Sequence, residues 1–117
     1  MAIMLETVTP PDRGLFAIDV KLTANIQVTP EMARRRVSVF VGNEIADLLY
    51  GEAPDLVLRE NGVYWRVPVV LASRSLGRVG NVGVIDVDVE TGDLNITDQT
   101  ISELEQNAQR LAVSTAL

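Results

Sequence analysis

The expected fold rests on the stretch FAIDVKLTANIQVTPE, which occupies residues 16–31. Its apolar residues recur at every second position, and in a strand such residues lie on one face. The pattern therefore predicts a long half-buried strand over residues 16–28, with a bend or bulge near residues 23–25 because single strands are usually shorter. The apolar positions are Phe16, Ile18, Val20, Leu22, Ala24, Ile26 and Val28.

A helix is expected to begin directly after this strand. Thr29 can cap a helix, Pro30 suits its first position, and Glu31 complements the positive end of the helix dipole. Residues 37–41 also have strand propensity, but the cap before them and Gly51 after them favour a helix. The apolar face of that helix comprises Ala33, Val37, Phe40, Val41, Ile45, Leu48 and Leu49.

Short apolar segments separated by turn signals follow, which is typical of an antiparallel meander. Asn61-Gly62 is a strong hairpin signal, and Thr91-Gly92 marks a second turn. Pro68 cannot donate to a sheet ladder, so a bulge or an edge position is expected there. The expected strands are 56–58, 64–72, 82–90 and 94–96, and residues 73–80 are expected to form a polar loop.

The last element has the spacing of an amphipathic helix. Thr97 or Asp98 can cap it, and its apolar face could pack on its own sheet, on a second copy or in a partner's groove. We therefore predict an α+β fold: an antiparallel sheet of four to five strands with one long helix packed on a face, in the β-α-β-β-β order of cystatin-like folds, plus a C-terminal helix. One domain is expected, with an irregular N-terminal segment (1–14), a core (15–96) and an acidic C-terminal helix (97–113).

Composition excludes several kinds of chemistry. The chain has neither Cys nor His, which rules out disulfides, thiolate and imidazole metal sites, Cys nucleophiles and Ser-His triads. The net charge of -6 lies in residues 86–117, where seven acidic side chains face Arg110 alone. Such an end repels nucleic acid, and no apolar run approaches the roughly 20 residues of a membrane helix. We expect a cytoplasmic protein without nucleic-acid or membrane partners.

Four short motifs lie in order between residues 29 and 96. They are the helix start TPEMA (29–33), the strand DLVL (55–58), the aromatic-led strand YWRVPV (64–69) and the hairpin VDVETGDL (87–94). In this order they resemble the PepSY domain. The resemblance implies a small cystatin-like module for inhibition, chaperoning or binding, without catalytic residues of its own. The alternating pattern at 16–28 and the acidic C-terminal helix lie outside it.

The acidic residues of the C-terminal third are candidates for a partner-binding surface. Three of them alternate along one strand and would share a face, where Arg66 is expected to pair with Asp88 or Glu90. The same three are a near miss to a calcium-binding loop, because a Thr stands where that loop needs its Gly. We therefore expect no metal site and no cofactor. The candidate surface comprises Asp86, Asp88, Glu90, Asp98, Glu103 and Glu105.

A possible pocket and a glycine-rich stretch each have a functional and a purely structural interpretation. A pocket between the long helix and the sheet would be lined by Phe40, Trp65 and Val87, although Trp65 on an apolar face is more typical of a core. Glycines recur every third residue from Gly77 to Gly83, but they precede a strand, so a flexible hairpin loop is expected rather than a phosphate-binding loop.

The sequence favours a non-catalytic protein-binding or regulatory module that acts through the acidic C-terminal surface or an exposed strand edge. The alternative is a module that binds an apolar small molecule in the pocket just described. An enzyme has the least support, because His and Cys are absent and no carboxylate pair is placed in a pocket. A homodimer fits all three hypotheses, since a long amphipathic strand and an amphipathic terminal helix favour two-fold association.

Overall fold

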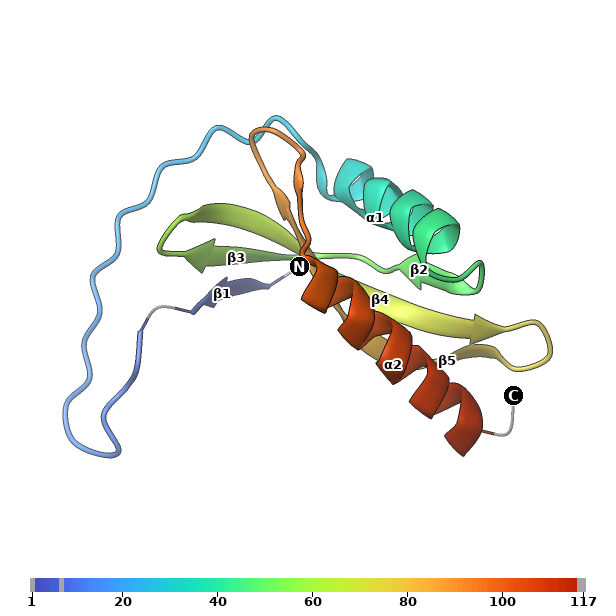
Figure 1. The fold of residues 1–117 in the computed structure, drawn as a ribbon. Coiled ribbons are helices and arrows are strands. Elements are labelled where there is room, and N and C mark those ends of the chain that lie inside the picture. The colour runs from blue at the N-terminus through green and yellow to red at the C-terminus, as the bar shows by residue number, and fades with distance from the viewer. Residues whose placement is uncertain (1, 7, 116–117) are drawn as a thin grey trace.

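The computed structural model describes residues 2–6 and 8–115 and has an α+β fold (Figure 1). Within that part of the chain, six strands form one sheet that two helices accompany, so the expected class is confirmed. The elements are, in chain order, β1 (Ile3–Leu5), α1 (Pro30–Glu44), β2 (Leu49–Gly51), β3 (Asp55–Arg59), β4 (Gly62–Ser73), β5 (Gly77–Asp88), β6 (Leu94–Asn95) and α2 (Asp98–Ser114).

Strand β4 is the centre of the sheet. It pairs antiparallel with β5 along one side, and with β3 and then β2 along the other. β6 pairs with β5, and β1 pairs with β3 in the parallel direction, with Met4 beside Val57. The segment 1–14, which was expected to be irregular, therefore contains a strand. Its three apolar residues are too few to show a period, which is why the sequence pattern misses β1.

The meander is confirmed, with shifted boundaries. Arg59 pairs with Gly62, so the first hairpin turns through Glu60 and Asn61. The bulge expected at Pro68 is present as a register shift between the two residues that follow it, Val69 and Val70. The predicted polar loop at 73–80 is wrong, because β5 already begins at Gly77 and the turn is correspondingly short.

Helix α1 begins where the sequence predicts but ends earlier. The Thr29 hydroxyl accepts a hydrogen bond from Met32 N at 3.1 Å, and residues 37–41 are helical. The helix ends at Glu44, so the helical positions predicted at 45–49 are wrong. Gly51 lies in β2, where a Cβ would come within 2.8 Å of a Val67 side-chain carbon. This glycine serves close packing beneath α1 rather than a helix cap.

Helix α2 packs on the sheet of its own chain. The Thr97 hydroxyl accepts from Thr100 N at 3.1 Å and so caps the helix. A Cβ at Gly83 would lie 2.6 Å from a Leu104 methyl carbon, and one at Gly80 would lie 3.1 Å from a methyl carbon of Leu111. Two of the three glycines that were expected in a flexible loop, Gly80 and Gly83, are thus strand residues that let α2 approach β5. Gly77, with φ of +75° and no such contact, stands where β5 leaves the turn.

The main core lies between the helices and one face of the sheet. The Trp65 ring is buried there, and its Nε1 donates to the Val28 carbonyl at 2.7 Å. Neighbouring residues on this face of β4 and β5 meet α1 and α2, and all belong to one apolar cluster. Its buried members include Val37, Val41, Trp65, Val67, Ile85, Val87 and Leu104.

The long strand predicted at 16–28 does not exist in the described structure. Residues 15–27 form no helix or strand; they start near the bend farthest from the sheet and run as an extended trace back to α1 (Figure 1). The period of two is present, but it has no neighbouring strand to pair with. We call residues 15–26 the extended segment.

Candidate binding surface

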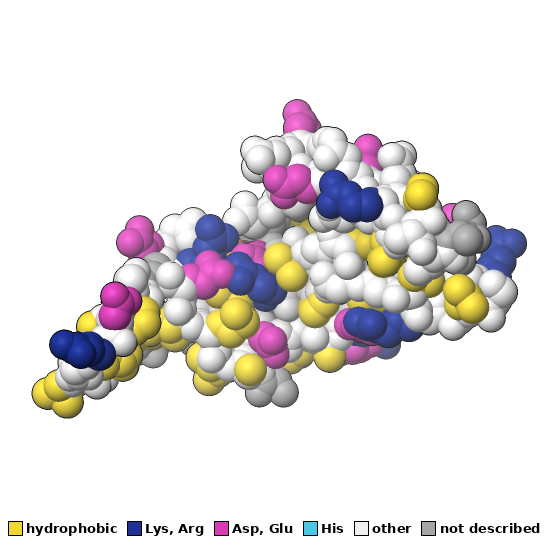
Figure 2. Space-filling view, turned by 90° about the horizontal axis from the view of Figure 1, so that it is seen from below, with side chains coloured by type: hydrophobic (Ala, Val, Ile, Leu, Met, Phe, Trp, Pro, Cys, Tyr) yellow, Lys and Arg dark blue, Asp and Glu magenta, His cyan; other side chains and the backbone are white. Residues whose placement is uncertain are grey.

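The extended segment exposes a row of large apolar side chains. Leu15 is 95% exposed. The following large apolar residues are each 48–50% exposed, since one side of the row faces solvent. Figure 2 shows hydrophobic side chains over the protruding left end of the molecule, where Figure 1 places this segment. The half-exposed residues are Phe16, Ile18, Val20, Leu22 and Ile26. A monomer seldom leaves so many neighbouring apolar side chains in water.

The backbone of the extended segment is equally unpartnered. In the described structure no hydrogen bond reaches the main chain of residues 15–24. Main-chain N–H and C=O groups normally find a partner in a helix or a sheet. An extended main chain with free groups and an alternating apolar row has the chemistry of an unpaired strand.

The segment is fixed at its C-terminal end. Gln27 N and Val28 N both donate to the Val89 carbonyl, at 2.9 and 3.0 Å. The Trp65 indole holds the Val28 carbonyl from the core side, as described above. The point of departure is therefore rigid, while the residues before it extend outward. This extension raises the radius of gyration to 16.1 Å, against about 13 Å for a compact domain of this length.

An apolar groove separates the extended segment from the outer strands of the sheet. Its volume is about 340 Å³, and every described residue that lines it is apolar. One wall is the inner side of the extended segment, and the other is formed by β1, β3 and the start of β4. The lining residues are Ile3, Val20, Leu22, Ala24, Ile26, Leu56, Leu58 and Val63. The segment's own sheet thus leaves its apolar row incompletely covered.

The predicted acidic surface is divided between two parts of the molecule. Asp86 is only 7% exposed and lies in an ion-pair cluster, so it is not available on a surface. Asp88 accepts hydrogen bonds from Glu90 N and Thr91 N and shapes the turn between β5 and β6. Glu90 is exposed, and its carboxylate accepts from Asn25 N at 3.4 Å.

The remaining three acidic residues, Asp98, Glu103 and Glu105, lie exposed on α2. Asp98 stands in the first turn, where it complements the helix dipole. Gln99 donates to Glu103 one turn further on, at 3.1 Å. The exposure of these side chains on α2 is that of an ordinary solvent-facing helix surface.

An ion-pair cluster joins β3, β4 and β5 to Glu6, the residue that directly follows β1. Arg66 donates to Asp86 through Nε at 2.8 Å and through a terminal nitrogen at 2.9 Å, and it also pairs with Glu6. Arg59 donates to the same Asp86 carboxylate at 3.2 Å. The hydrogen bond with Asp86 raises the pKa of Arg66 above its usual value, and the contact with Glu6 adds to the shift. These contacts tie three strands and the residue after β1 together, which is a structural role.

The prediction that Arg66 pairs with Asp88 or Glu90 is therefore wrong, because its partner on β5 is Asp86. In the observed register Arg66 stands opposite Asp86, because the β4–β5 turn is shorter than the loop predicted from the sequence. Asp88 stands opposite Tyr64 instead, and Glu90 lies beyond the strand.

The pocket predicted between helix and sheet is filled. Trp65 and Val87 are 3% and 0% exposed and belong to the core, and Phe40 packs against the same cluster. Within the described part of the chain these three residues line packed interior. The apolar groove beside the extended segment lies elsewhere, and sequence reasoning missed it because it placed that segment in the sheet.

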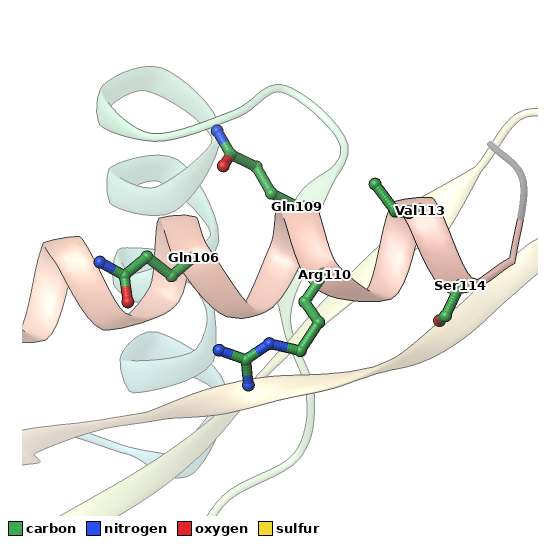
Figure 3. A pocket seen from close by; sticks show the side chains of 5 residues that line it. All are labelled: Gln106, Gln109, Arg110, Val113 and Ser114. Carbon is green, nitrogen blue, oxygen red and sulfur yellow. The ribbon is translucent and has the colours of Figure 1, made fainter.

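A shallow hollow of about 530 Å³ follows the outer side of α2. Figure 3 shows the five described residues that line it, Gln106, Gln109, Arg110, Val113 and Ser114. All five come from one helix, so no groups from different elements converge there. Such a surface lacks the enclosing apolar walls of a ligand site.

Among residues 2–6 and 8–115, no three acidic side chains lie close enough together to hold one metal ion. The described helices include none with the length and apolar content needed to cross a bilayer.

Comparison with known proteins found no match for this chain among protein-family models, curated proteins or solved structures. The resemblance to PepSY domains stays a prediction.

Proposed function

We propose that this chain is a non-catalytic protein-binding module that acts by strand addition through its extended segment. The observation that carries the proposal is a half-exposed, alternating apolar row in residues 15–26 together with a main chain that is free of hydrogen bonds over residues 15–24 of the described structure. A partner strand laid beside this segment would satisfy its N–H and C=O groups and cover its apolar side chains at once. Binding of this kind obtains affinity from the main chain and specificity from every second side chain.

The extended segment is favoured over the acidic surface for two reasons. Asp86 is already paired with Arg59 and Arg66 of its own chain, so its charge is not free to attract another molecule. The carboxylates on α2 are exposed, and exposed charges contribute little affinity because water and salt screen them. The extended segment offers apolar area together with unpaired main-chain groups.

The experiment compares three versions of the full chain. Leu22→Asp places a charge in the apolar row, and Val39→Asp places one on α1 at a residue that is already 63% exposed. We expect wild type and Val39→Asp to retain the same bound polypeptide in cells, and Leu22→Asp to lose it. Equal retention by all three, or the absence of any bound polypeptide with the wild type, would contradict the proposal.

A second function is favoured by the apolar groove. Its volume of about 340 Å³ lies within the range of small-molecule sites, and its described lining is wholly apolar. An apolar ligand there would raise the melting temperature of wild type but not of Leu56→Asp, whose side chain lines the groove from β3. A screen of fatty acids and aromatic ligands that finds no shift would count against this function.

A further inference from the structure

We propose that the strand added to the extended segment comes from a second copy of this chain. Residues 15–25 of two copies would pair antiparallel about a two-fold axis that passes between the two Val20 residues. This inference rests on the proposed function, because it names the partner of the same segment. It assigns a register as well as a partner.

The charges of the segment select this register. Asp19 and Lys21 are the only charged residues between 15 and 25, and both are exposed. With the axis at Val20, Asp19 of each copy stands opposite Lys21 of the other, and the two pairs are related by symmetry. Opposite charges that face each other across an antiparallel pair stabilise it, and like charges destabilise it.

Neighbouring registers fail on the same criterion. A shift by one residue sets apolar against polar side chains and is disfavoured wherever one face is buried. A shift by two residues moves the axis by one residue, either to Asp19 or to Lys21. In the first register Asp19 stands opposite Asp19 of the second copy, and in the other Lys21 stands opposite Lys21. The register centred on Val20 is the nearest one that matches both the apolar row and the charges.

The apolar row fits this pairing over its whole length. With the axis at Val20, Ile18 stands opposite Leu22, and Phe16 stands opposite Ala24. Each apolar side chain of the row therefore meets an apolar side chain of the other copy. Residues directly opposite each other in an antiparallel pair point to the same side. Both apolar rows therefore face the side on which each copy carries its apolar groove. Gly14 has φ of +103°, so the extended conformation begins only at the next residue, Leu15.

The first experiment is a charge exchange read by sedimentation equilibrium. Asp19→Lys alone and Lys21→Asp alone each create two like-charge pairs in the dimer, and each should weaken self-association about tenfold or more. The double variant Asp19→Lys/Lys21→Asp restores both pairs and should restore association. A mixture of the two single variants should form a heterodimer. Both positions lie outside every helix and strand, so the fold of the chain is retained.

The second experiment tests the axis itself. The chain has no cysteine, so a single introduced thiol is unique. Val20→Cys would place two thiols opposite each other, and treatment with diamide, which takes up the two electrons and two protons, should link the copies covalently. The control Val39→Cys is exposed on α1 and should stay unlinked.

The inference is overturned if wild type stays monomeric at all concentrations, or if neither the double variant nor the mixture recovers association. It is also overturned if Val20→Cys links no faster than Val39→Cys. If Leu22→Asp still abolishes binding of a different polypeptide in that case, the proposed function stands and only the second copy is wrong. If Leu22→Asp has no effect on any binding, the proposed function fails with it.

Discussion

Replacing Asp86 by alanine should destabilise the fold strongly, although the sequence suggests a surface residue. Its carboxylate accepts three hydrogen bonds from guanidinium groups, two from Arg66 and one from Arg59, and only 8% of its side chain is exposed. Removing one partner of a buried ion pair costs about 3–5 kcal/mol. The two arginines are 19% and 34% exposed, and Arg66 keeps Glu6 as a partner. Water and Glu6 therefore reduce the loss to the lower end, about 3 kcal/mol.

Urea unfolding followed by the fluorescence of Trp65, the only tryptophan, measures this loss. A decrease of about 3 kcal/mol corresponds to a fall of roughly 10 °C in melting temperature for a domain of this size. The control is Glu105→Ala, which removes an exposed carboxylate from α2 and should change stability by less than about 0.5 kcal/mol. If Asp86→Ala lowers the free energy of unfolding no more than the control does, Asp86 does not hold a stabilising ion-pair cluster.

Three further outcomes follow from the geometry. Gly83→Val should destabilise the chain by about 1–3 kcal/mol, because the added side chain collides with α2, and circular dichroism during thermal unfolding measures the loss. Trp65→Phe should cost about 1–3 kcal/mol, since it leaves the Val28 carbonyl without its donor, and amides 27–28 should then exchange faster. Hydrogen bonds from Arg34 lower the pKa of Glu31 to about 2, so Glu31 stabilises the folded chain above pH 4.5 and loses that effect as the pH falls to 2. The urea midpoints of wild type and Glu31→Gln should therefore converge between pH 4.5 and 2.

Local chemistry predicts much of this fold from the sequence. The cap at Thr29 and the cap at Thr97 mark the starts of both helices because each hydroxyl has a definite main-chain donor to satisfy. The bulge beside Pro68 follows from the missing N–H of proline. Such features depend on a few neighbouring residues, so they survive the step from sequence to structure.

The errors arise where the outcome depends on distant residues. The alternation at 16–28 specifies an extended chain with two different sides, but a strand also needs a neighbour, and the described chain supplies none. The close approach of α2 to Gly80 and Gly83 is likewise invisible until the helix is placed on β5. The burial of Asp86 depended on a register that the short β4–β5 turn shifts by one pair. The candidate site therefore moved from the acidic residues to the extended segment.

Amide hydrogen exchange resolved by peptide or by residue tests the central claim most directly. The full chain is measured alone at low concentration and again in the complex that Leu22→Asp abolishes. In the free chain, amides 15–24 are expected to exchange at nearly the rate of an unstructured peptide. In the complex they should be protected in the alternating pattern of an antiparallel strand, while α1 changes little. Unprotected amides at 15–25 in the complex would contradict strand addition through this segment.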